Sequence, residues 1–192
     1  MLEKFSRKIA VWLIKSGILE NDNTELYGYA IQYLLLIIIP TINFFAYCIA
    51  THNIIVGLII LFSFLLIRKY SGGYHCKSST VCLIFSTIVL IAMVFYANLM
   101  NFSPVIIITI ILCELELIIK GPIISINHDI SDKERIIYRK YLYVILAVYD
   151  IIMALFIYFN KIHLACSIAI VIITCSLAHV ICMIGKNKEV YY

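Results

Sequence analysis

Long apolar runs separated by short polar connections dominate the sequence. Six such runs follow a short acidic link, at about residues 29–50, 53–67, 80–100, 104–119, 141–159 and 162–184. A transmembrane helix needs about 17 to 25 predominantly apolar residues, so the second and fourth runs must borrow flanking residues or lie where the bilayer is thin. The pattern therefore predicts an all-α, polytopic membrane protein with about six transmembrane helices.

The first 20 residues show a different pattern, in which apolar and basic residues alternate at helical spacing. One face of such a helix carries Phe5, Ile9, Trp12 and Leu13. These side chains can enter the membrane surface while the basic residues between them reach lipid headgroups. No small-residue cleavage site follows, so a secretory signal is not predicted. We expect residues 1–20 to form an interfacial amphipathic helix.

The composition supports the same class of protein. Of the 192 residues, 64% are hydrophobic and only 14% are charged, whereas about half of the residues of a soluble domain are apolar. The length allows six spans of about 20 residues each but no additional soluble domain. We therefore expect one membrane-embedded domain over residues 1–192, with the lipid bilayer as a partner.

The basic residues indicate an orientation. Of the 15 Lys and Arg, 14 lie in residues 4–15, 68–77, 120–140 and 186–188, which six spans place on one side of the membrane, and only Lys161 lies on the other side. Because Lys and Arg accumulate in cytoplasmic loops, we expect both termini and the connection between the second and third spans to be cytoplasmic. The net charge of +4 sits beside apolar runs and suits anionic lipid headgroups, so we expect no nucleic acid as a partner.

The connection between the second and third spans gathers chemically useful residues. It reads, with the start of the next apolar run, RKYSGGYHCKSSTVC from residue 68 to residue 82. Gly72 and Gly73 allow backbone conformations with positive φ. His75 titrates near neutral pH, and Cys82 can supply a thiolate. A histidine within hydrogen-bond reach is the usual activator of a cysteine nucleophile.

The seven-residue spacing of His75 and Cys82 requires a bend in the chain. On one straight helix the two residues would lie about 10.5 Å apart along the axis, too far for a hydrogen bond of about 3 Å. We therefore expect the glycines to fold His75 back on Cys82, which lies in the first turn of the third span, where the helix dipole favours a thiolate. Ser79 is the rival nucleophile, but its hydroxyl is weaker and no carboxylate lies near in the sequence to orient the histidine.

No metal site and no cofactor is predicted. A zinc site built from His75, Cys76 and Cys82 lacks a fourth ligand, and the sequence contains no CxxC pair. The seven cysteines lie mostly in apolar runs, where cysteine behaves as a small hydrophobic residue, so no disulfide framework is implied.

The sequence RKxSGGYH, followed seven residues later by Cys, resembles the signature of the accessory gene regulator B (AgrB) family, membrane cysteine endopeptidases that process quorum-sensing peptides. The resemblance implies a cytoplasmic catalytic loop at residues 68–80. Its catalytic pair would be His75 and Cys82, with Arg68, Gly72 and Gly73 as supporting residues. Cys76 departs from the small residue expected after the histidine and leaves a second thiol near the site.

The resemblance also implies a substrate and a location. An AgrB-like enzyme of a bacterial cell membrane removes the C-terminal part of an AgrD-like precursor peptide through a thioester acyl-enzyme. It then promotes ring closure to a thiolactone or lactone autoinducing peptide. The N-terminal helix would either anchor the enzyme or help to recruit an amphipathic substrate. The oligomeric state stays open, and a homo-oligomer is allowed.

Residues 120–140 form the longest polar interval and the second predicted cytoplasmic loop. Pro122 ends the preceding helix, and Ser131 with Glu134 fits a capping box that opens the fifth span. Pro122, Asn127 and Glu134 also resemble the second cytoplasmic loop of the AgrB family.

Carboxylates inside the apolar runs suggest an alternative function. Glu114, Glu116 and Asp150 lie where ionisable groups are functional candidates, as in a small transporter or a peptide export component. We expect a buried hydrogen bond for Asp150, and either an i,i+4 pair with Lys120 or snorkelling for Glu116. His179 and the cysteines on either side of it share a helix face and are interpreted as packing.

Overall fold

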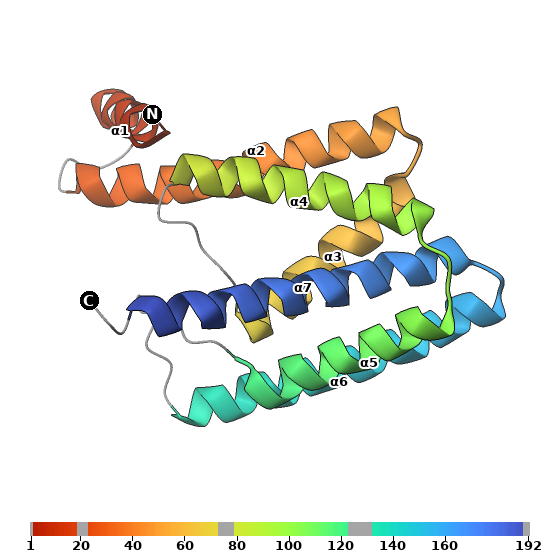
Figure 1. Ribbon diagram of the computed structural model, residues 1–192. Helices are drawn as coiled ribbons and strands as arrows, with labels where there is room; N and C mark the ends of the chain where they lie inside the picture. Colours follow the sequence, from red (N-terminus) through yellow and green to blue (C-terminus); the bar gives the residue numbers. More distant parts are fainter. Residues whose placement is uncertain (1, 19–22, 73–78, 123–131, 190–192) are drawn as a thin grey trace. The chain divides into compact units, whose positions relative to one another are not determined.

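The computed structural model describes residues 2–18, 23–72, 79–122 and 132–189, and these residues form seven α-helices without a strand (Figure 1). The helices are α1 (Leu2–Lys15), α2 (Thr24–Ala50), α3 (Ile54–Ser71), α4 (Ser79–Leu99), α5 (Pro104–Lys120), α6 (Asp132–Tyr158) and α7 (Ile162–Glu189). The predicted all-α fold is confirmed.

Five of the described helices, α2, α3, α4, α6 and α7, are long and apolar enough to cross a membrane. The helix α5 has 17 residues, which is at the short end of the range for a span. The chain is therefore a polytopic membrane protein. As expected, the second apolar run gains length from flanking residues, because α3 continues to Ser71.

Local sequence signals explain where α5 and α6 begin. Ser103 caps α5 by accepting a hydrogen bond from the backbone N–H of Ile106 at 3.4 Å, and Pro104 takes the first helical position, where a missing N–H costs nothing. The helix α6 begins at Asp132, as a cap at the preceding residue requires. That residue, Ser131, lies outside the described residues.

The chain divides into two compact units, each of which is described by itself: Met1–Ala50 with His75–Ile91, and Thr51–Tyr74 with Ala92–Tyr192. In the first unit α1 packs on α2. Ser6, Ala10 and Gly28 are buried, and a Cβ on Gly28 would lie 3.7 Å from Cα of Arg7. Small residues on both helices thus let the two backbones approach closely. The expectation of one domain stays a prediction.

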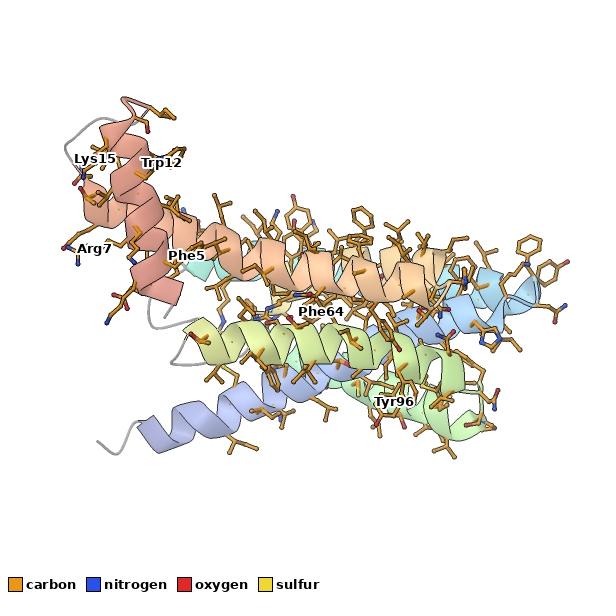
Figure 2. The ribbon with its side chains drawn as sticks, turned by 90° about the horizontal axis from the view of Figure 1, so that it is seen from above. Phe5, Arg7, Trp12, Lys15, Phe64 and Tyr96 are labelled. Atoms are coloured by element: carbon orange, nitrogen blue, oxygen red, sulfur yellow. The ribbon has the colours of Figure 1, made fainter. Side chains whose placement is uncertain are left out.

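The helix α1 is amphipathic, as its sequence predicts. Figure 2 shows Phe5 and Trp12 on one side of α1 and Arg7 and Lys15 on the other. The side chains of Phe5 and Trp12 are 55% and 62% exposed, although both are large and apolar. Such a helix suits the boundary between acyl chains and headgroups, and its location there stays a prediction.

In the second unit α7 is the central helix, because it packs against α3, α5 and α6 (Figure 1). Much of its buried surface consists of small side chains. They are Ala165, Cys166, Ser167, Ala169, Cys175 and Ser176. Small residues allow close contact between helices where the hydrophobic effect does not distinguish neighbouring helices from lipid.

Candidate active site

The helix α3 ends at a glycine, as the sequence predicts. The backbone N–H of Gly72 donates a hydrogen bond of 3.1 Å to the carbonyl oxygen of Arg68. Gly72 then adopts φ 78° and ψ −169°, a backbone region open almost only to glycine. The hydroxyl of Ser71 donates to the carbonyl oxygen of Gly72 at 3.0 Å. A residue with a side chain at position 72 would therefore redirect the chain that leaves α3.

Arg68 lies in the last turn of α3, where a cation is stabilised by the negative end of the helix dipole. Its guanidinium carbon lies 5.4 Å from the centroid of the Phe64 ring, within the range of a cation–π contact. The side chain is half-buried. Arg68 is thus held by its own helix at the point where the signature sequence begins.

Cys82 lies in the first turn of α4, because that helix begins at Ser79. Its thiol is free of a disulfide, and the residue is half-exposed. The backbone N–H groups at a helix N-terminus carry a partial positive charge, which favours an anionic sulfur nearby. The predicted place of Cys82 in the third span is confirmed.

The contact between histidine and cysteine stays a prediction. His75, Gly73 and Cys76 lie outside the described residues. Arg68 and Gly72 belong to the second unit and Cys82 to the first, so each end of the signature is described by itself.

A buried polar network joins α5 to α7. Nδ1 of His179 lies 2.7 Å from Oε1 of Glu116, and the hydroxyl of Ser176 donates to Oε2 of the same carboxylate at 3.0 Å. His179 is fully buried, and its Nε2 has no hydrogen-bond partner among the described residues. The expectation for Glu116 needs correction, because its carboxylate binds α7 and not Lys120 of its own helix.

The interpretation of His179 as a packing residue fits its burial but did not include this hydrogen bond. Two ionisable residues in separate apolar runs were the only signal that could have suggested it, because each is costly in a membrane without a partner. The spacing of residues along the sequence does not predict which carboxylate forms a hydrogen bond with His179.

A second pair joins α5 to α6. The carboxylates of Glu114 and Asp150 lie close enough to interact electrostatically, and Oε1 of Glu114 is buried without a hydrogen-bond partner among the described residues. The expectation of a buried hydrogen bond for Asp150 needs correction, because Asp150 is exposed, whereas the neighbouring Tyr149 is buried. Of the three carboxylates on which the transporter alternative rests, Glu116 forms hydrogen bonds with a neighbouring helix. In the part of the chain that the structure describes, no three His, Cys, Asp or Glu side chains are placed to hold a metal ion.

These features define a multi-pass α-helical membrane protein with a half-exposed cysteine at the start of one span. Residues 6–183 match the accessory gene regulator B family, and the chain therefore belongs to the AgrB family. The match covers the end of α3, Cys82 and the helices of the second unit up to residue 183.

Two relatives from Clostridium perfringens are similar over part of the chain. An AgrB-like protein of strain SM101 (type A) is 29% identical over 117 residues, and an AgrB-like protein 2 of strain 13 (type A) is 31% identical over 118 residues. Each match covers 58% of this chain and 55% of the relative, so the chain spans about half the length of the curated relatives it matches. No solved structure matches the chain.

Proposed function

We propose that the protein is a membrane cysteine endopeptidase that processes an AgrD-like precursor peptide into a quorum-sensing signal. Membership of the AgrB family supports the link to quorum sensing. The observation that carries the proposal is the place of Cys82, a half-exposed thiol without a disulfide in the first turn of α4. A nucleophile needs this combination of access and a positive local field, which a cysteine packed in the middle of a span lacks.

The proposed reaction begins with proton transfer from the thiol of Cys82 to His75. The sulfur attacks the carbonyl carbon of the scissile peptide bond, and the carbon–nitrogen bond breaks as His75 returns the proton to the leaving amine. The products of this step are a free C-terminal fragment and a thioester between Cys82 and the remaining peptide.

Ring closure then regenerates the enzyme. A thiol or hydroxyl of the bound peptide attacks the thioester carbonyl, and its proton passes through His75 to the sulfur of Cys82, which leaves. The result is a thiolactone or a lactone. A thioester retains enough reactivity for this exchange only if water is kept away, and a nucleophile at the end of a membrane span is partly shielded from water.

The substrate is expected to meet the enzyme at the cytoplasmic face. This side follows from the distribution of Lys and Arg. Gly72 supports the placement of His75 after a sharp change of chain direction, because its positive φ ends α3 three residues before the histidine.

Three variants test the nucleophile in membranes or detergent with a synthetic precursor. Ser79→Ala should keep most of the cleavage, Cys82→Ala should leave the precursor intact, and Cys82→Ser should be severely impaired because a hydroxyl is a poorer nucleophile. Insertion of each variant into the membrane serves as the control. Cleavage by Cys82→Ala would show that the assignment is wrong.

Trapping the intermediate provides a second, direct test. A precursor that lacks its ring-closing nucleophile should accumulate on the wild-type enzyme as an adduct that hydroxylamine removes. Mass spectrometry should locate this adduct on the peptide that contains Cys82. The transporter alternative makes the opposite prediction, since a transporter should keep its activity when all seven cysteines are replaced.

A further inference from the structure

An aromatic cluster holds the end of α3. This cluster, which we call the tyrosine clamp, consists of Tyr70 of α3 with Tyr138 and Tyr141 of α6. The rings of Tyr70 and Tyr138 meet edge to face, with centroids 5.6 Å apart and planes at 88°. The rings of Tyr70 and Tyr141 have centroids 5.3 Å apart and planes at 36°. Because residues three apart share a helix face, the two α6 tyrosines reach Tyr70 together.

The same stretch of α6 also holds the end of α5. Arg139 donates from Nε and Nη2 to the carbonyl oxygen of Gly121, at 3.2 and 3.1 Å. Gly121 directly follows α5, and its N–H donates to the carbonyl oxygen of Leu117 at 2.9 Å. A side chain at position 121 would clash with that oxygen, so a glycine is required. Three positions within one turn of α6, Tyr138, Arg139 and Tyr141, thus contact the ends of two other helices.

We propose that the tyrosine clamp positions the end of α3 for catalysis, and that Tyr138 and Tyr141 are positioning residues for the reaction at Cys82. This inference rests on the proposed function. Tyr70 lies two residues before Gly72, where α3 ends, and five residues before His75. A displacement of about 1 Å at a reacting group can lower a rate about 100-fold. Fixing the last turn of α3 removes one source of such displacement.

The packing of α3 in the unit does not depend on these rings. Further along α3, Ile60, Ser63 and Ile67 are buried, and α3 packs against both α6 and α7. The ring of Tyr70 is only half-buried at the end of the helix. Loss of the clamp should therefore free the last turn while the rest of α3 stays packed.

The clamp is tested on α6, far in sequence from the signature. The double variant Tyr138→Leu/Tyr141→Leu should lower kcat for precursor cleavage about 10- to 100-fold and leave KM nearly unchanged. The matched variant Tyr138→Phe/Tyr141→Phe keeps the aromatic rings, so its kcat should be close to that of the wild type. Tyr143→Leu is the control and should behave as wild type, because Tyr143 is about as exposed as Tyr141 but is not one of the two tyrosines whose rings contact Tyr70.

A second readout separates positioning from general stability. With the other cysteines replaced, His75→Ala should slow alkylation of Cys82 by iodoacetamide at fixed pH, because the thiolate fraction falls. The double leucine variant should slow it toward the same value, and the double phenylalanine variant should not. If the double leucine variant does not insert, Tyr138→Leu alone keeps the contact of Tyr70 with Tyr141 and should show both effects to a smaller degree.

The outcomes distinguish the two proposals. Normal kcat and normal alkylation in an inserted leucine variant would overturn the clamp while wild-type cleavage still supports the proposed function. The proposed function itself would be overturned if the wild type did not cleave the precursor and if His75→Ala did not change the rate of Cys82 alkylation.

Discussion

The network of Glu116, His179 and Ser176 predicts a measurable coupling between α5 and α7. Replacing His179 by Leu leaves the Glu116 carboxylate with only the hydrogen bond of 3.0 Å from Ser176. Replacing Glu116 by Leu leaves both ring nitrogens of the buried His179 without a partner, because Nε2 already lacks one. Either change leaves a polar group with fewer hydrogen bonds than in the wild type, and the double change Glu116→Leu/His179→Leu removes both groups.

The expected magnitude follows from the burial of the two partners. Breaking a fully buried ion pair costs about 3–5 kcal/mol, but the side chain of Glu116 is 15% exposed. The lower range for an unpaired buried polar group, about 1–3 kcal/mol, therefore applies to each single variant. Hydrogen bonds between membrane helices show coupling energies of about 0.6 kcal/mol on average and about 1.7 kcal/mol at most. At 2.7 Å and full burial of His179, we expect about 1 to 1.5 kcal/mol of coupling.

The assay is a double-mutant cycle on the free energy of unfolding, measured in mixed detergent micelles at one pH. The double variant should lose less unfolding free energy than the two single variants lose together. Thr174→Val provides the matched control, because the Thr174 hydroxyl bonds to the carbonyl oxygen of Ile170 in its own helix, and its effect should add to that of Glu116→Leu. Coupling near zero between Glu116 and His179 would refute the α5–α7 hydrogen bond.

Two further predictions concern the topology and the end of α3. Single cysteines at Ser103 and Ser131 in a thiol-free background should react with impermeant reagents from opposite sides, Ser103 from outside, because 14 of 15 basic residues occupy the other side; labelling from one side would contradict six spans. Gly72→Val should reduce precursor cleavage sharply while insertion persists, because a β-branched residue disfavours φ 78°; full activity of this variant would remove the turn from the mechanism.

The helices could be predicted from the sequence because each depends on local signals. A cap at residue 131 fits the start of α6 at Asp132, Gly72 marks the end of α3, and the place of Cys82 follows from the start of α4 at Ser79. The short fourth apolar run likewise predicts that α5 is a short helix. These features need only neighbouring residues, so periodicity and capping rules suffice.

The contacts between helices could not be predicted in the same way. Glu116 and His179 are 63 residues apart, and their pairing depends on how α5 and α7 rotate against each other. The sequence offered Lys120 as a closer partner for Glu116, which the structure corrects. The same limit applies to the tyrosine clamp, because Tyr70 and Tyr138 meet only after α3 and α6 have packed.

The burial of the cysteines has a consequence for oxidative chemistry. Cys48, Cys166 and Cys175 are at most 5% exposed, so hydrogen peroxide and polar electrophiles have little access to them. Cys82 is half-exposed at the very end of its span, where a thiolate can be oxidised to a sulfenic acid that thiols reduce again. If Cys82 is the nucleophile, signal production should pause reversibly under oxidative stress, which would link the output of a cell population to the redox state of its members.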